Sequence, residues 1–295
     1  MNWHFNRTPL TKQTCRYRQR KLFMNIYFDQ KLADNYRSKS QIARILTESW
    51  ALNNIYCPRC GHDKILHFPN NSAVADFYCP SCNSEYELKS KKGSFGKKIP
   101  DGAYDTFLQR ITSQNNPDFF ILTYNENAMC VENLWVVPKH FFVPSIVEKR
   151  KPLSSTSRRA GWTGCNILFG EIPLQGQISM IKNRSPIEKD SVVMQMEQST
   201  RLNAGNLNTR SWLFDVLNCV NQIQGSIFTL HDVYAFDEFL SQRHPHNSHV
   251  RAKIRQQLQF LRDEGYLEFI DRGVYRKTDA ATSPVIKLHP RSSEE

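Results

Sequence analysis

Two pairs of closely spaced cysteines constrain the fold of this chain more than any other feature. Cys57 and Cys60 form one CxxC pair, and Cys79 and Cys82 form a second pair after an interval of 18 residues. Each pair lets two thiolates on one tight turn bind the same ion, and the two pairs together complete the tetrahedron of a structural zinc site. Turn-forming residues flank both pairs, which favours this geometry over four unrelated buried cysteines. The spacing therefore predicts a Zn²⁺ site within residues 57–82.

The rest of the chain has neither a membrane segment nor a second cysteine pattern. No stretch approaches the roughly 18 to 20 apolar residues of a membrane-spanning helix, and the first residues lack the apolar core of a signal peptide. We therefore expect a cytoplasmic protein with no membrane partner, in which paired cysteines bind metal rather than form disulfides. Ordinary thiols are expected at Cys15, Cys130, Cys165 and Cys219.

The basic charge of the chain is unevenly distributed. The formal net charge is +11, from 39 basic and 28 acidic side chains, which favours a polyanionic partner. Residues 1–23 contribute six of these charges and contain no acid, which leaves +5 for the remaining chain. This prefix is either a basic arm that binds phosphates or a disordered leader ahead of a start at Met24, and the usual disorder of biased termini favours the second.

Amphipathic and apolar segments alternate in the first two thirds of the chain. Initial serines and a stripe of apolar residues predict a helix over 38–53, and a second helix is expected over 101–115. Apolar runs predict buried strands over 119–124 and 134–138. This alternation indicates an α/β core, which we assign to residues 24–195.

A second compact unit follows a polar stretch over 183–209, within which we expect a linker over 196–206. Over 207–277 the pattern predicts three helices and then a β-hairpin, the order of a winged helix-turn-helix domain. Residues 278–295 are expected to form a disordered tail. The expected elements are helices over 212–223, 230–240 and 248–264 and hairpin strands over 266–270 and 274–276.

The second cysteine pair lies in the turn between two strand-like segments, 73–78 and 85–90. Side chains alternate along a strand, so Glu87 and Lys89 share one face, and pairing of the two segments could bring Asp76 close to them. Two carboxylates can hold a Mg²⁺ ion at a scissile phosphate, and an adjacent ammonium can orient or deprotonate the attacking water. A surface salt bridge on an edge hairpin is the alternative interpretation.

Asp76, ten further residues and the triplet 87–89 (ELK) resemble the PD-(D/E)xK nuclease motif, with Ala75 where proline often stands. The resemblance extends over nearly all of residues 24–277 and is to the DpnI-like methyl-directed (type IIM) restriction endonucleases. Besides the CxxC pairs, it is carried by KSQIARILTE (39–48), ADFYC (75–79), ELKSKKG (87–93), DGAY (101–104), RRAGWTGCNI (158–167), QGS (224–226) and IRQQLQFLRD (254–263).

This resemblance implies a PD-(D/E)xK restriction-endonuclease-like domain of the α/β class with an embedded four-cysteine zinc site, followed by a winged-helix domain. It implies cleavage of double-stranded DNA at GATC when the adenine carries an N6-methyl group, with catalytic Mg²⁺ and structural Zn²⁺. By matching positions, Asp76, Glu87 and Lys89 become the catalytic residues, and the main-chain carbonyl of Leu88 becomes a further Mg²⁺ ligand. Glu48 stands where many such nucleases carry a supporting acid, although a solvated helix residue is at least as good an interpretation.

Two groups of basic side chains are candidate DNA contacts. Arg158 and Arg159 can bind phosphates or guanine edges, and Trp162 can form one wall of a pocket for an adenine methyl group. Gly161 and Gly164 would let the backbone approach a groove. The alternative is a Trp162 packed in the core beside exposed arginines. In the second unit, the candidate contacts are Arg251, Lys253, Arg255 and Arg272.

Three functions are compatible with these patterns. The first is a monomeric, Mg²⁺-dependent endonuclease that requires methylated GATC. The second is a zinc-ribbon and winged-helix DNA-binding regulator without catalysis, and the third is a structure-selective repair nuclease. The pair of Glu87 and Lys89 favours a nuclease, because a binding module has no need for it.

Overall fold

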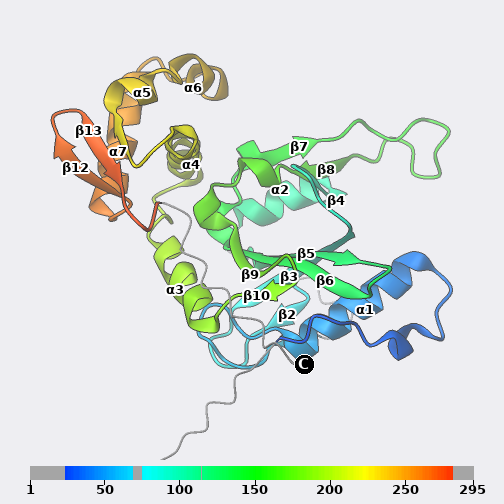
Figure 1. Cartoon of the computed structure of the whole chain (residues 1–295). Coiled ribbons are helices and arrows are strands. Elements are labelled where there is room, and N and C mark those ends of the chain that lie inside the picture. Colours follow the sequence, from blue (N-terminus) through cyan, green and yellow to red (C-terminus); the bar gives the residue numbers. More distant parts are fainter. Residues whose placement is uncertain (1–23, 69–74, 114, 282–295) are drawn as a thin grey trace, which may run out of the picture.

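The computed structural model describes residues 24–68, 75–113 and 115–281 (Figure 1). The predicted basic extension over 1–23 and the end of the predicted tail, 282–295, lie outside the described residues. A larger α/β unit built on a central sheet is followed by a helical unit with a small sheet, as the predicted fold class requires (Figure 1). No helix within the described segments is both long and apolar enough to cross a membrane.

A seven-stranded sheet forms the centre of the larger unit, in the order β1-β2-β3-β5-β6-β9-β10. β3 and β5 run parallel, and the other neighbouring strands pair antiparallel. The strands predicted over 119–124 and 134–138 correspond to β5 and β6. The bounds are β1 (Leu66–His67), β2 (Phe77–Tyr78), β3 (Glu85–Lys92), β5 (Asp118–Asn125), β6 (Cys130–Val137), β9 (Ile178–Lys182) and β10 (Ser185–Pro186).

β5 is buried on both faces, which explains its continuous apolar sequence. Phe119 and Ile121 belong to one cluster of buried residues, whereas Phe120 and Leu122 belong to the other. The predicted first helix is α1 (Lys39–Asn54), which packs in the second of these clusters through its apolar stripe. The sheet therefore separates two cores, and each is covered by helices.

On the opposite side of the central sheet, α2 (Tyr104–Thr112) packs together with a small sheet of order β4-β8-β7. The helix predicted over 101–115 is wrong at its start, because residues 101–103 belong to β4. Pairing with β8 and the poor helix propensity of Gly102 explain the difference. The strands of this sheet are β4 (Ile99–Ala103), β7 (Val147–Lys149) and β8 (Gly164–Ile167). Short 3₁₀ helices connect the elements at η1 (Gln30–Ala33), η2 (Lys139–Phe141), η3 (Pro144–Ile146), η4 (Phe169–Glu171) and η5 (Leu174–Gly176).

The second unit has the helices and hairpin of the predicted winged-helix domain. The single helix predicted over 230–240 is two short helices, because Phe236 leaves the helical backbone at φ −95° and ψ 9°. A strand before them, β11, was not predicted, and it completes a sheet of order β11-β13-β12. The bounds are α4 (Leu207–Gln222), β11 (Ile227–Thr229), α5 (Leu230–Tyr234), α6 (Asp237–Arg243), α7 (Val250–Asp263), β12 (Leu267–Asp271) and β13 (Val274–Lys277).

The connection between the two units is more ordered than the predicted linker over 196–206. α3 (Lys189–Thr200) extends into that range, so the linker prediction is wrong for residues 196–200. Val192 and Met196 are buried one helical turn apart, and both pack in the core on the α1 side of the central sheet. This burial stabilises a helix in a sequence that otherwise looks polar.

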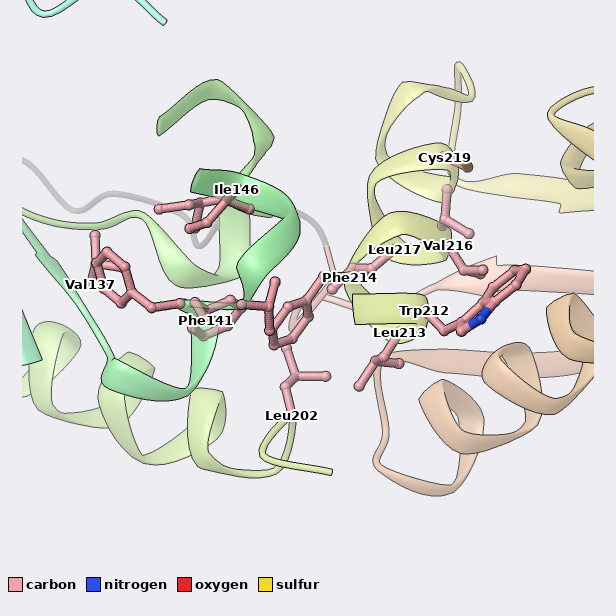
Figure 2. Packing of buried hydrophobic residues seen from close by; sticks show 14 of the residues in the cluster. Val137, Phe141, Ile146, Leu202, Trp212, Leu213, Phe214, Val216, Leu217 and Cys219 are labelled. Atoms are coloured by element: carbon pink, nitrogen blue, oxygen red, sulfur yellow. The ribbon is translucent and has the colours of Figure 1, made fainter. Parts of the chain in front are cut away.

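The two units share one continuous core (Figure 2). Phe141, which follows β6, and Phe214 of α4 stack with ring centroids 4.7 Å apart and an interplanar angle of 17°. Figure 2 shows these two rings side by side where the units meet. A hydrogen bond from Asn218 Nδ2 to the Glu171 carbonyl (2.7 Å) also joins the two units. The winged-helix unit is therefore packed against the α/β unit rather than tethered to it.

The first residues of the predicted tail over 278–295 also pack against the protein. Thr278 N–H donates to the Tyr266 carbonyl (3.1 Å), and Gln175 Nε2 donates to the Ala281 carbonyl (2.7 Å). Ala281 is buried at 2% exposure. The prediction of a disordered tail is therefore wrong for residues 278–281.

Candidate active site, zinc site and DNA-contacting surfaces

β3 carries different kinds of side chain on its two faces, as the alternation of its sequence predicted. Tyr86 is fully buried, and Leu88 packs against the same core on the α1 side of the sheet. Glu87 and Lys89 lie on the opposite face, and Lys89 Nζ is 2.6 Å from Glu87 Oε1. The strand therefore presents an acid and a lysine side by side.

Asp76 immediately precedes β2, the strand that pairs with β3. Its backbone N–H donates to the Tyr86 carbonyl (3.0 Å), and its Oδ2 atom accepts a hydrogen bond from the Leu88 N–H (2.8 Å). The register pairs Phe77 with Tyr86, so Asp76 lies at the N-terminal end of β2, beside the backbone of Tyr86 and Leu88. Asp76 therefore contacts the backbone of the strand that carries Glu87 and Lys89, and the catalytic role of the three residues stays a prediction.

Two further charged residues complete this cluster, and neither was predicted as a site residue. Asp101 of β4 places Oδ1 2.6 Å from Lys89 Nζ. Arg110 of α2 places Nη1 2.8 Å from Glu87 Oε2. Lys89 therefore contacts two carboxylates, and Glu87 contacts two cations, in a part of the protein where all four side chains are mostly buried.

The electrostatic surroundings of Lys89 favour its charged form. Burial alone lowers the pKa of Lys89, but the nearby carboxylates of Glu87 and Asp101 more than reverse that effect and raise the pKa above its ordinary value. The side chain is therefore an ammonium throughout the neutral pH range.

A groove of about 520 Å³ opens beside this cluster, between α1 and β3. Leu88, Lys89 and Glu48 all contribute to its lining. Glu48 is 23% exposed, and its Oε1 atom is 2.7 Å from Arg44 Nε. Glu48 therefore lines the same groove as Leu88, on the α1 side of β3, and its role stays a prediction.

The four predicted zinc ligands converge at one point. Cys57 Sγ is 3.6 Å from Cys82 Sγ, Cys60 Sγ is 3.6 Å from Cys79 Sγ, and all four sulfurs lie within 4.8 Å of one another. A tetrahedron with Zn–S bonds of about 2.3 Å has sulfurs about 3.8 Å apart, so the cluster fits zinc. In the part of the chain that the structure describes, this is the one group of three or more Cys, His, Asp or Glu side chains close enough to share an ion. Cys15 lies outside the described residues, and the remaining cysteines are buried free thiols at Cys130, Cys165 and Cys219.

Contacts from the sheet support the cysteine cluster. The Tyr86 hydroxyl lies 3.0 Å from Cys57 Sγ, and Tyr86 directly precedes Glu87 on β3. Arg59, between the cysteines of the first pair, forms a two-point ion pair with buried Asp118 at the start of β5, with N–O distances of 2.7 and 3.0 Å. The cysteine cluster is thereby joined to the two strands that run through the centre of the sheet.

The long connection between β7 and β8 contains the first group of candidate DNA contacts. In Figure 1 this connection, which we call the arm (residues 150–163), extends away from the rest of the α/β unit. Arg158 and Arg159 are exposed, and the Arg159 guanidinium lies 4.6 Å from the centre of the Trp162 ring. Trp162 is half-buried rather than buried, so its interpretation as a core tryptophan is not supported.

Gly164 packs directly against the Trp162 ring. A Cβ atom at this position would lie 2.9 Å from the Trp162 ring, so the glycine gives the ring space to lie against the backbone. Gly161 has a positive φ of +80°, which suits the turn of the arm. Gly164 therefore supports Trp162, and its role in the approach of the backbone to a DNA groove stays a prediction.

α7 presents the second group of candidate contacts. Arg255 Nη1 donates to the Tyr234 hydroxyl (2.7 Å), and the Arg251 guanidinium lies 4.8 Å from the centre of the Tyr234 ring. Arg251 also forms an ion pair with Asp237, with Nε 2.5 Å from Oδ2. Both arginines are exposed and Lys253 is half-buried. Tyr234 therefore orders two arginines on the exposed face of α7.

The hairpin of β12 and β13 places Arg272 at its exposed tip. Its two other basic residues have partners within the protein, because Arg276 Nη1 lies 3.1 Å from Glu268 Oε2 and Lys277 Nζ donates to the Ile223 carbonyl. Arg272 is therefore the basic residue of the hairpin that is best placed to reach a ligand.

Family models match both units of this chain. The model of the Dam-replacing family, DpnI, matches residues 24–204, which is more than half of the chain. The chain belongs to the Dam-replacing family. The model of the Dam-replacing HTH domain matches residues 208–277, which contain α4 to α7 and the small sheet. Membership in the Dam-replacing family confirms the resemblance stated from the sequence and supports a methylation-dependent restriction nuclease that binds DNA.

Three residues of the candidate sites carry no signal in the sequence of this family member. Asp101 stands in the DGAY segment, where the pattern predicts the start of a helix, and only the pairing of β4 with β8 brings it to Lys89. Arg110 and Tyr234 lie on helices, where a basic or aromatic residue has many ordinary roles. Their contacts are tertiary, so no local pattern identifies them.

Proposed function

We propose that this chain cleaves double-stranded DNA at GATC sites that carry N6-methyladenine, by Mg²⁺-dependent hydrolysis of a phosphodiester bond. The observation that carries the proposal is a hairpin of a Dam-replacing family member on which Glu87 and Lys89 lie side by side and Asp76 contacts the intervening Leu88 N–H. Two carboxylates and an ammonium beside a groove suit phosphodiester hydrolysis, because the first bind a divalent ion and the last offsets negative charge.

Asp76, Glu87 and the main-chain carbonyl of Leu88 would hold the Mg²⁺ ion. This donor set fits the ion, which prefers oxygen ligands and usually takes one or two carboxylates while keeping phosphate and water ligands. When bound, Mg²⁺ activates water and offsets the charge of the phosphate. The Leu88 N–H fixes the orientation of Asp76 by donating to Oδ2 (2.8 Å).

Lys89 acts as a cation rather than as the base. Its ammonium lies 2.6 Å from each of two carboxylate oxygens, of Glu87 and Asp101, and such contacts stabilise the charged form. From that position Lys89 orients the attacking water and stabilises the negative charge that develops on the phosphate.

DNA recognition is divided between the two units in this proposal. In the arm, Arg158 and Arg159 bind the DNA backbone or guanine edges, and Trp162 contacts the methylated adenine. In the winged-helix unit, α7 enters the major groove and the hairpin contacts the backbone. The residues that make these second contacts are Arg251, Lys253, Arg255 and Arg272.

Replacement of Asp76 by alanine tests the mechanism with short duplexes. The Asp76→Ala variant should bind a methylated GATC duplex as the wild type does and should fail to cleave it, because it lacks one carboxylate of the Mg²⁺ site. An Asp34→Ala variant, which removes an exposed carboxylate elsewhere, serves as the control and should cleave normally. Cleavage that survives in Asp76→Ala would exclude this mechanism.

The same duplexes separate the two other functions. A DNA-binding regulator without catalysis would bind the duplex, and the wild type would leave it intact at every Mg²⁺ concentration. A structure-selective repair nuclease would cleave flap or branched substrates and would be indifferent to adenine methylation. Selective cleavage of the methylated linear duplex supports the proposed function over both.

A further inference from the structure

Asp101 is a buried carboxylate that lies beside the predicted catalytic triad but belongs to a different sheet. Its side chain is 8% exposed. The Oδ1 atom accepts hydrogen bonds from Lys89 Nζ (2.6 Å) and from the Gly102 N–H (2.7 Å). The Oδ2 atom is buried and has no hydrogen-bond partner among the described residues. Such a carboxylate is costly to bury, so its retention requires a compensating charge, and the Lys89 ammonium supplies it.

Three groups from three strands surround the Lys89 ammonium. Glu87 on β3 and Asp101 on β4 each place an oxygen 2.6 Å from Nζ, and the centre of the Phe119 ring on β5 lies 5.9 Å away. A lysine side chain has four flexible carbon–carbon bonds, so a single partner leaves its ammonium free to move. Asp101 supplies a second anchor that does not move with β3, the strand on which Lys89 stands.

We propose that Asp101 is a positioning residue that holds the Lys89 ammonium in place for cleavage. This inference rests on the proposed function, in which Lys89 stabilises the reacting phosphate. Asp101 acts through Lys89, and the Mg²⁺ ligands remain Asp76, Glu87 and the carbonyl of Leu88.

The backbone around Asp101 also connects Lys89 to the arm. Asp101 pairs with Cys165 of β8, and after a register shift Ala103 pairs with Gly164. Tyr104 N–H then donates to the Thr163 carbonyl (3.0 Å), one residue after Trp162. The anchor of the lysine therefore lies on the strand that is hydrogen-bonded to the end of the arm, so the positions of the arm and of the ammonium are linked.

An Asp101→Asn variant tests the proposal because it keeps the shape of the side chain and removes its charge. Single-turnover cleavage of methylated GATC duplex should slow by about 10- to 100-fold, the loss expected when a group that orients an active-site residue is removed. DNA affinity, measured with Ca²⁺ in place of Mg²⁺, and zinc content should stay at the wild-type level. An Asp105→Asn variant, with the same charge change at an exposed position on α2, should cleave at the wild-type rate.

A double-variant cycle distinguishes positioning from a general structural role. If Asp101 acts through Lys89, adding Asp101→Asn to a Lys89→Met variant should not slow cleavage further. The losses in Tm of the two single variants should also add to more than the loss of the double variant, because both remove the same ion pair. An Asp101→Glu variant, which retains the charge, should recover part of the cleavage rate.

The possible results separate the inference from the proposed function. A wild-type cleavage rate in Asp101→Asn, or fully additive losses in Tm, would overturn the positioning role while leaving methyl-directed cleavage intact. If the wild type itself cleaved no DNA, the proposed function would fail. The additivity of the Tm losses would then decide whether Asp101 holds Lys89 at all.

Discussion

Phe214 joins the two units of the protein, and its replacement by alanine should weaken both of them together. The side chain is 2% exposed, and its ring stacks on that of Phe141 across the junction at 4.7 Å between centroids. Replacing a buried phenylalanine by alanine costs about 3–5 kcal/mol through lost burial and the cavity left behind. Because the ring is almost wholly buried and also stacked, we expect a loss of about 4 kcal/mol in the free energy of unfolding.

Urea denaturation followed by circular dichroism measures this loss. Since the two units share one core, the wild type should unfold in a single transition, and Phe214→Ala should shift that whole transition to lower urea. Phe239→Ala provides a matched control in the same unit, because Phe239 is 40% exposed on α6. The control should lose less than about 1 kcal/mol.

Two results would refute this account of the junction. The first is an equal loss for Phe214→Ala and Phe239→Ala. The second is a wild type that unfolds in two separate transitions of which Phe214→Ala shifts only one. Either result would restore the flexible linker that the polar sequence over 183–209 suggested.

Three other perturbations have expected outcomes. Metal analysis should find about one zinc per chain. Tyr86→Phe removes the hydroxyl beside Cys57 and should weaken zinc binding by about tenfold or more in a chelator competition assay. An unchanged zinc affinity would exclude a supporting role of the Tyr86 hydroxyl. Burial lowers the pKa of His140 to about 4, below its unfolded value of 6.5. The unfolded chain therefore binds a proton that the folded chain does not, and about 3 kcal/mol of stability should be lost as pH falls from about 6.5 to 4. Urea titrations should show this pH dependence in the wild type and not in His140→Gln. The same pH dependence of the free energy of unfolding in both proteins would contradict the prediction. Gly164→Ala should displace the Trp162 ring and reduce cleavage of methylated duplex as Trp162→Ala does, whereas wild-type cleavage by Gly164→Ala would show that the ring position is unimportant.

Patterns of short period predicted that the four cysteines converge and that Glu87 and Lys89 lie side by side. Two thiolates on one CxxC turn are near neighbours whatever the rest of the chain does, and the side chains of Glu87 and Lys89 must share a face of any strand. The proximity of Asp76 followed from pairing across a short turn. Each of these predictions depended on local geometry alone.

Features that depend on distant contacts could not be predicted in this way. The local pattern predicts a helix at Asp101. No local feature indicates that residues 99–103 pair with a strand more than 60 residues away. The polar stretch before the second unit contains Val192 and Met196 at helical spacing, but two apolar residues are a weak signal until a core is present to bury them. The Phe141–Phe214 contact likewise exists only after both units have folded.

Digestion of one plasmid prepared from two hosts tests the central claim most directly. Plasmid from a host that methylates the adenine of GATC and plasmid from a host that lacks this methylation are incubated with the protein, Mg²⁺ and, in parallel, the Asp76→Ala variant. The account predicts that the wild type cuts the methylated plasmid into the fragments expected for GATC and leaves the unmethylated plasmid intact, while Asp76→Ala cuts neither. Equal cutting of both plasmids by the wild type would contradict methyl-directed cleavage.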